Sequence, residues 1–216
     1  ERKMLIKKII AALAFSAIAL LGADFKEGIN YKTLETPLDV EKNTIVKVWS
    51  YTCPFCYKYD KAVTEAVINK IPNIDFEVWH LKTKGTYGQQ GSNLMAVAYA
   101  RDIKAGKTIF DKSGFLKKMK FAYYKAYHTK KQRWDSGEDD FYKEGFKILS
   151  VDKAAFEKEL AKPEVQELLK KWDAAYPVAK VQGIPGFVVN GKYLLMTQKI
   201  KSREYMVDLI TYLLKK

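Results

Sequence analysis

The sequence predicts an α/β fold in which an all-helical segment is inserted into a domain built on one β-sheet. Three observations support this prediction. A β-branched run at residues 44–49 leads into a Cys-x-x-Cys motif and then into a helical pattern. Residues 94–172 repeat their apolar side chains at helical spacing with no strand signal. Strand patterns resume in the last part of the chain, which places these helices inside the sheet domain rather than after it.

The first sheet elements surround the Cys-x-x-Cys motif. Residues 29–34 alternate enough for a first strand, and residues 45–49 are largely apolar and β-branched, which predicts a strand buried in the sheet. Residues 57–71 carry apolar side chains at helical spacing, and Pro72 ends that helix. Residues 75–81 alternate strictly and predict the next strand. The order strand, strand, cysteine motif, helix, strand is typical of the opening of a thioredoxin-type fold.

The helical insertion follows a glycine-containing loop at residues 82–92 and is expected to hold five helices. Apolar spacing predicts the first three over residues 94–103, 115–127 and 141–149. Asp152 is expected to cap the fourth helix, Pro163 to open the fifth, and Pro177 to end or kink it. The aromatic stripes of these helices are interpreted as core rather than as a ligand site, because helices of this length must bury one face.

The final part of the chain returns to strand patterns. Two apolar runs flank Asn190-Gly191, and this dipeptide predicts a tight hairpin because both central residues need a positive φ. Ser202 is expected to cap a last helix. The sequence therefore predicts a thioredoxin domain in two parts and one helical insertion, with boundaries at 24–82, 83–176 and 177–216.

Residues 1–23 have the order of a secretory signal. A basic start is followed by an apolar run at residues 9–21 and by the small residues Gly22 and Ala23. The apolar run is too short for a comfortable transmembrane helix, so we expect cleavage after Ala23; an uncleaved N-terminal anchor is the alternative. Such a signal leads to an oxidising compartment, which we expect to be the periplasm.

The chain carries a formal net charge of +13, and its basic residues crowd the region between Arg101 and Asp135. This region either forms a solvated helical face or attracts acidic partner proteins or the membrane surface. Nucleic acid is not an expected partner of an exported protein. The charge alone therefore does not indicate a function.

Cys53 and Cys56 are the only cysteines in the sequence. Cys53 is expected at a helix N-terminus, with Pro54 at the first helical position, where its missing N–H costs nothing. The free backbone N–H groups and the positive end of the helix dipole favour a thiolate there. This environment suits a sulfur that takes part in redox chemistry.

Two other uses of the cysteine pair are less well supported. A zinc site would need about four ligands, and the only histidines, His80 and His128, are far from any ligand spacing. A purely structural disulfide would close almost no loop and therefore stabilise little. The favoured interpretation is a redox couple that binds no metal and needs no organic cofactor.

A second motif makes the pattern specific. Gly183-Ile184-Pro185 lies just before the predicted hairpin. Together with Cys53-Pro54-Phe55-Cys56 and the helical insertion, it resembles the DsbA family of exported thiol–disulfide oxidoreductases. The resemblance implies a thioredoxin domain split by a helical domain and a cis peptide bond before Pro185. It also implies that Ile184 and Pro185 bind an extended substrate strand beside Cys53.

Two positions depart from the family pattern. The best-known member has His between the cysteines where this chain has Phe55, so the couple is expected to be somewhat less oxidising. A Cys-Pro-Phe-Cys centre with a basic surface resembles the DsbL members of the family. Lys47 stands where thioredoxin-like proteins often bury an acid; under the cysteines its ammonium would stabilise the thiolate, with Asp75 or Glu77 as a partner. The alternative is that Lys47 reaches solvent at a strand edge.

The resulting hypothesis is a monomeric enzyme that donates its Cys53–Cys56 disulfide to newly exported proteins. A substrate thiolate attacks Cys53, Cys56 leaves, and the second substrate thiol then expels Cys53. The resemblance implies re-oxidation by a membrane quinone reductase of the DsbB or DsbI kind. One alternative is an isomerase or reductase kept in the dithiol form, and another is a non-catalytic chaperone-like binding module.

Overall fold

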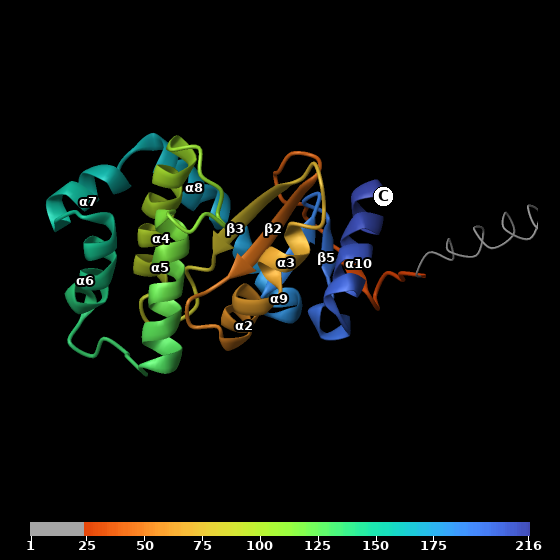
Figure 1. The fold of residues 1–216 in the computed structure, drawn as a ribbon, viewed down its shortest axis with the longest axis horizontal. Coiled ribbons are helices and arrows are strands. Elements are labelled where there is room, and N and C mark those ends of the chain that lie inside the picture. Colours follow the sequence, from red (N-terminus) through yellow and green to blue (C-terminus); the bar gives the residue numbers. More distant parts are fainter. Residues whose placement is uncertain (1–23) are drawn as a thin grey trace, which may run out of the picture.

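The computed structural model describes residues 24–216, so the predicted signal at residues 1–23 lies outside the described residues. Figure 1 shows a sheet with helices packed on it and, beside the sheet, a lobe of helices. The strands are β1 (Tyr31–Thr33), β2 (Thr44–Trp49), β3 (Asp75–His80), β4 (Gly186–Val189) and β5 (Tyr193–Leu195).

The helices fall into two groups. Those near the sheet are α2 (Pro54–Ala62), α3 (Thr64–Ile68), α9 (Ala175–Gln182) and α10 (Arg203–Lys215), with a short 3-10 helix η3 (Thr197–Lys199). Between β3 and α9 the chain forms α4 (Gly88–Lys104), α5 (Phe115–Tyr124), the π-helix η2 (Lys125–Thr129), α6 (Glu138–Leu149), α7 (Lys153–Leu160) and α8 (Pro163–Trp172). This second group is the helical insertion.

The five strands form one sheet in the order β1-β5-β4-β2-β3. Strand β2 pairs with β3 in parallel and with β4 antiparallel, while β5 pairs antiparallel with β4 and β1. All of β2 is buried, as its apolar and β-branched sequence predicts. Asn190 and Gly191 adopt φ of 53° and 66° between β4 and β5, which confirms the predicted hairpin turn.

The register of β2 and β4 brings two distant parts of the sequence together. Val48 lies opposite Gly186, so the residues that follow β2 and those that precede β4 meet at the same end of the sheet. Cys53 follows β2, and the Ile184-Pro185 segment precedes β4. The topology thus forms one site from segments on either side of the helical insertion.

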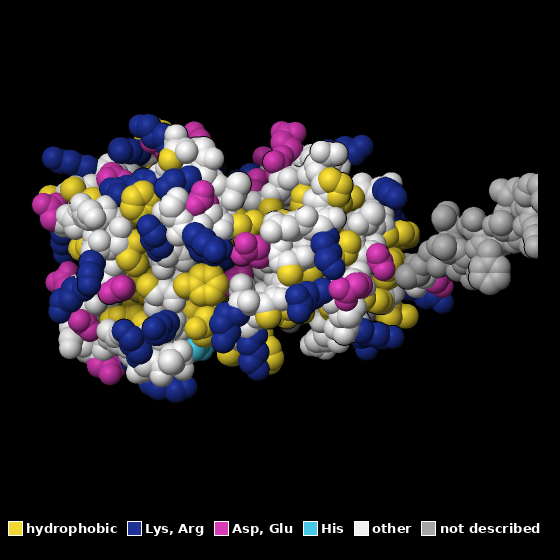
Figure 2. Space-filling view, viewed as in Figure 1, with side chains coloured by type: hydrophobic (Ala, Val, Ile, Leu, Met, Phe, Trp, Pro, Cys, Tyr) yellow, Lys and Arg dark blue, Asp and Glu magenta, His cyan; other side chains and the backbone are white. Residues whose placement is uncertain are grey.

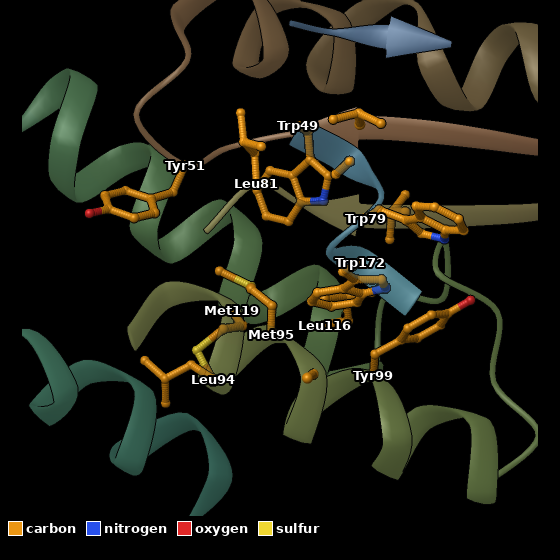
Figure 3. Packing of buried hydrophobic residues seen from close by; sticks show 14 of the residues in the cluster. Trp49, Tyr51, Trp79, Leu81, Leu94, Met95, Tyr99, Leu116, Met119 and Trp172 are labelled. Carbon is orange, nitrogen blue, oxygen red and sulfur yellow. The ribbon is translucent and has the colours of Figure 1, made fainter. Parts of the chain in front are cut away.

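The two faces of the sheet pack into separate apolar clusters. The face that carries Ile45 and Phe187 packs on α3 and α10. The opposite face, with Val46 and Val48, packs on α9 and continues into the core of the helical insertion. Figure 3 shows part of this second cluster, in which Trp172 of α8 lies among tryptophan and aliphatic side chains from the strands, α4 and α5. The aromatic stripes of the inserted helices are mostly core, as predicted.

Three predicted helix boundaries are wrong. Helix α4 begins at Gly88, inside the predicted loop at residues 82–92. The helix predicted over residues 57–71 breaks at Val63, between α2 and α3. Just after this break the Thr64 hydroxyl accepts a hydrogen bond from the buried Lys47 ammonium over 3.2 Å. Pro177 neither ends nor kinks α8, and lies instead in the first turn of α9. Proline is tolerated there because the N–H groups of a first turn have no acceptor within their own helix.

Three predicted helix-start signals, at Asp152, Pro163 and Ser202, are confirmed. Asp152 accepts a hydrogen bond from a backbone amide of α7, and Ser202 does the same for α10. Pro163 is the first residue of α8. The helix predicted over residues 115–127 forms two segments, since α5 passes directly into the π-helix η2.

The basic side chains of the insertion lie mostly on its surface. Figure 2 shows Lys and Arg side chains dispersed among acidic and hydrophobic ones over the helical lobe. Lys120 of α5 differs, because its side chain is only 5% exposed. Within residues 24–216, no helix combines the length and the apolar character needed to cross a membrane.

Candidate active site

The Cys-x-x-Cys motif lies at the N-terminus of α2. Cys53 is the N-cap residue, Pro54 is the first helical residue, and Cys53 and Cys56 form a disulfide. The backbone amide of Cys56 donates a hydrogen bond to Cys53 Sγ over 3.0 Å. An amide directed at a sulfur in the first turn of a helix stabilises negative charge on that sulfur. After reduction of the disulfide, this geometry therefore favours the thiolate of Cys53.

The two sulfurs differ in their access to a substrate. Cys56 is fully buried, whereas Cys53, although only 3% exposed, lines a groove of about 580 Å³. Phe55 is 61% exposed and forms part of the groove wall, together with Tyr59 of α2 and Lys84. Of the two sulfurs, only that of Cys53 therefore belongs to a residue that lines the groove.

The segment before β4 forms the opposite side of the groove. The carbonyl oxygen of Ile184 lies 3.4 Å from Cys53 Sγ, within reach of a hydrogen bond from the thiol of a reduced Cys53. The peptide bond between Ile184 and Pro185 is cis, as the family resemblance implies. Backbone groups next to the reactive sulfur can add hydrogen bonds to an extended peptide.

Lys47 of β2 is completely buried and does not reach solvent at a strand edge. Its expected pairing with Asp75 or Glu77 is wrong. Lys47 Nζ contacts Asp60 Oδ1 of α2 at 2.5 Å, whereas Glu77 pairs with a lysine of α8 at 2.8 Å. The reason is the register of β2 on β3. Lys47 lies opposite Val78 and shares its face of the sheet, whereas Asp75 and Glu77 direct their side chains to the opposite face.

Asp60 holds a cluster of buried polar groups together. Besides Lys47, its carboxylate contacts Lys120 Nζ at 3.3 Å and accepts a hydrogen bond from the Tyr124 hydroxyl at 2.9 Å. Asp60 follows Cys56 by four residues on α2, so both lie on the buried side of the helix. The cluster therefore sits one helical turn behind the cysteine pair.

The charges in this cluster affect one another strongly. Burial by itself raises the pKa of Asp60, but the ammonium groups of Lys120 and Lys47 outweigh burial and hold the pKa at about 2. Burial is the main effect that lowers the pKa of Lys47, Asp60 opposes it, and the like charge of Lys120 adds to it, so that the pKa lies at about 8. Near neutral pH we assign a negative Asp60 and a positive Lys47.

Two histidines contact the loop that leads from β2 to the cysteines. His80 Nε2 accepts a hydrogen bond from the amide of Tyr51 over 3.4 Å, and its Nδ1 lies 2.8 Å from the Ser92 hydroxyl. His128 Nε2 lies 3.0 Å from the carbonyl oxygen of Tyr51. Burial lowers the pKa of His80 to about 3 and also lowers that of His128. Both histidines are thus engaged in holding this loop.

The structure brings most of the sequence-predicted residues into one place. Pro54, Phe55, Ile184 and Pro185 line the groove with Cys53 (Cys56 lies behind it), while Lys47 lies on the far side of α2 from solvent. Sequence reasoning missed Asp60, Lys120 and Tyr124. The available signal was their spacing: Asp60 falls on the same helical face as Cys56, and Lys120 interrupts the apolar stripe of α5.

The sequence profile of the DSBA-like thioredoxin domain family matches residues 44–206. The chain belongs to the DsbA family. The thiol:disulfide interchange protein DsbL of Escherichia coli O6:H1 is 49% identical over 212 residues, which cover 97% of this chain and 96% of that relative. These matches confirm the family and the resemblance to its DsbL members.

Solved structures agree with this assignment. The crystal structure of DsbL from Salmonella enterica serovar Typhimurium has a TM-score of 0.85 to this chain at 49% identity, and the match covers 90% of this chain and 99% of that one. DsbA from Proteus mirabilis has the same fold, with a TM-score of 0.69 at 21% identity over 89% of this chain and 98% of that one. The thioredoxin fold with a helical insertion is therefore confirmed. The protein is a thiol:disulfide oxidoreductase, and the Cys53–Cys56 disulfide is its redox-active group.

Proposed function

We propose that this DsbA-family oxidoreductase acts as an oxidant, which donates its Cys53–Cys56 disulfide to reduced proteins in the periplasm. The observation that carries the proposal is the amide of Cys56, which donates to Cys53 Sγ at the N-terminus of α2. A fold that stabilises the Cys53 thiolate stabilises the reduced enzyme relative to the oxidised one. Electrons then flow from substrate thiols to the enzyme, which is the direction of an oxidant.

The reaction proceeds in two exchanges. A substrate thiolate attacks Cys53 Sγ, the bond between Cys53 and Cys56 breaks, and Cys56 leaves with the electron pair, so that a mixed disulfide joins the substrate to Cys53. The second substrate thiolate then attacks the substrate sulfur of this mixed disulfide and expels Cys53 as a thiolate. The substrate gains one disulfide, and the enzyme takes up two electrons as a dithiol. A better leaving group departs faster, so stabilising the Cys53 thiolate promotes the second exchange.

Each groove residue has a distinct role in this proposal. Ile184 offers its backbone to an extended substrate segment, and Pro185 shapes the chain beside Cys53. Phe55 supplies exposed apolar surface to the substrate, and Pro54 starts the helix that activates the sulfur. Lys47 adds a positive charge behind the cysteine pair.

The cellular setting completes the proposal. Residues 1–23 direct export and are removed after Ala23, and the mature protein is a monomer with its helical insertion at residues 83–176, between thioredoxin parts 24–82 and 177–216. Its substrates are reduced exported proteins. A membrane quinone reductase of the DsbB or DsbI kind re-oxidises the enzyme. Trapping the cysteines by alkylation in intact cells tests this setting, and a mainly dithiol population would favour an isomerase or reductase instead.

The deciding experiment measures the redox properties of the purified protein. We expect a reduction potential, determined against glutathione, that is more oxidising than that of thioredoxin, and a Cys53 thiol pKa far below the value of about 8.5 for free cysteine. The reduced protein should also resist denaturant better than the oxidised protein. Equal unfolding midpoints for the two forms, or an ordinary thiol pKa, would overturn the oxidant assignment.

Two substitutions distinguish the roles of Cys53 and Cys56. Cys53→Ser should abolish oxidation of a dithiol peptide, because no sulfur remains in the groove. Cys56→Ser, incubated with oxidised glutathione, should instead accumulate a mixed disulfide at Cys53. The Cys53 thiolate attacks one glutathione sulfur, the other glutathione leaves as a thiolate, and no Cys56 sulfur is present to displace the bound glutathione. Formation of the same adduct by Cys53→Ser would show that Cys56, rather than Cys53, is the sulfur that reacts, and would contradict the proposed roles.

A further inference from the structure

The charge cluster behind the cysteine pair is built from two parts of the molecule. Lys47 comes from β2 and Asp60 from α2, both of the sheet domain. Lys120 and Tyr124 come from α5, which belongs to the helical insertion. The insertion therefore supplies an ammonium and a hydroxyl to a carboxylate that lies one turn along the active-site helix.

Burial makes these contacts strong. The side chains of Lys47, Asp60 and Lys120 are 0%, 3% and 5% exposed. One carboxylate faces two ammonium groups, so the cluster carries a net positive charge when all three are ionised. Charges removed from water in this way act over longer distances than charges on the surface, because the surrounding protein screens them less.

Helix α5 is also packed directly against the active-site helix. The rings of Tyr124 and Tyr57 stack with their centroids 4.9 Å apart, and Tyr57 is the residue after Cys56. The Lys120 ammonium lies 5.4 Å from the centroid of the Trp49 ring, at the end of β2. These contacts fix Lys120 against the two elements that flank the cysteine motif.

We propose that Lys120 is a positioning residue of the redox centre, through which the helical insertion sets how readily Cys53 is released as a thiolate. Asp60 balances only one of the two ammonium groups, and Lys120 supplies the second, so the cluster is net positive behind the cysteines. This net positive field stabilises the thiolate of the reduced enzyme. Without Lys120, Asp60 and Lys47 form a neutral pair, and the field is lost. The inference rests on the proposed oxidant function and names a part of the chain that regulates it.

The size of the effect follows from one charge at short range. A helical turn of about 5.4 Å separates Cys56 from Asp60, and Lys120 lies a further 3.3 Å beyond the Asp60 carboxylate, so its charge lies on the order of 10 Å from the sulfurs. With an effective dielectric constant of about 20, a unit charge at this distance changes an equilibrium by roughly tenfold. We therefore expect Lys120→Met to shift the equilibrium with glutathione roughly threefold to tenfold toward the disulfide form.

Three matched variants of the full chain separate the field from a structural effect. Lys120→Arg keeps the positive charge at the same place. Lys117→Met removes another lysine of α5, one that pairs with Glu65 and is more exposed. Tyr124→Phe removes the hydroxyl that contacts Asp60 but leaves all charges in place. If Lys120→Met does not fold, Lys120→Gln replaces it, since its amide still reaches toward Asp60.

The readouts are the equilibrium constant with glutathione and the Cys53 thiol pKa from ultraviolet absorbance. We expect Lys120→Met to weaken the oxidant and raise the thiol pKa, while Lys120→Arg, Lys117→Met and Tyr124→Phe stay within about twofold of the parent protein. An unchanged Lys120→Met, or an equal shift in Lys117→Met, would overturn the inference. A parent protein that is itself reducing, with an ordinary thiol pKa, would instead defeat the proposed function, whatever Lys120→Met does.

Discussion

His80 makes the stability of the protein depend on pH in a way that can be calculated. Its imidazole is fully buried, and burial lowers its pKa from 6.5 to about 3. In the unfolded chain the ring titrates near pH 6.5, so between about pH 6.5 and 3 the unfolded state binds a proton that the folded state does not. The free energy of unfolding therefore decreases as the pH falls through this window.

The magnitude follows from the width of the window. Each pH unit between the two pKa values costs about 1.4 kcal/mol, so at about pH 4.5 His80 alone removes about 2.7 kcal/mol of stability. A loss of this size is a large fraction of the stability of an ordinary domain. Burial also lowers the pKa of His128, so this ring acts in the same direction, but it is only partly buried.

Urea unfolding of the oxidised protein at about pH 7 and about pH 4.5 measures this effect. His80→Asn and His80→Gln cannot bind the proton, and each can replace one of the two hydrogen bonds of the ring. Carboxylates lose stability equally in all variants, so the difference between parent and variant isolates His80. The parent should lose about 2.7 kcal/mol more than either variant, and His128→Gln should retain most of the loss seen in the parent. Equal losses in parent and both His80 variants would refute the argument.

Three further changes test other parts of the structure. Gly145→Ala places a Cβ 2.5 Å from a methyl carbon of the buried Leu94, and this overpacking should lower the free energy of unfolding in urea by about 1–3 kcal/mol. In a double-mutant cycle with Leu94→Val, the two stability changes should not add, and additive changes would contradict the contact. Asp102→Ala removes a buried carboxylate that accepts 2.8 Å hydrogen bonds from the first two backbone amides of α5. The change should lower the free energy of unfolding by about 1–2 kcal/mol, and an unchanged free energy would show that Asp102 does not stabilise this helix start. Phe55→Ala should change the free energy of unfolding by less than about 0.5 kcal/mol, because the side chain is 61% exposed. It should nevertheless slow oxidation of a dithiol peptide, and an unchanged rate would show that Phe55 does not contact the substrate.

Local patterns were sufficient for the elements that position the site. The β-branched run of β2, the proline after Cys53 and the Asn190-Gly191 turn each have one favoured backbone conformation, and all three adopt it. The groove could be anticipated only through the family resemblance. Nothing in the spacing alone places Ile184 next to Cys53, because that contact depends on β4 pairing with β2.

The buried charge cluster was harder to predict for a physical reason. Sequence patterns assume that charged side chains face water, and Lys47, Asp60 and Lys120 break this assumption together. Each of them is acceptable in the interior only because the others are present. Adjacent strands suggested Asp75 or Glu77 as the partner of Lys47, but the true partner comes from the helix that crosses above the strand.

Strand β4 lies in the middle of the sheet, between β2 and β5, although it is made near the end of the chain. As the polypeptide is synthesised, both cysteines emerge long before the segment that holds Ile184. Until that segment arrives, one side of β2 has no partner and the thiols have no groove. The groove beside Cys53 is therefore complete only once β4 has paired with β2 at the centre of the sheet.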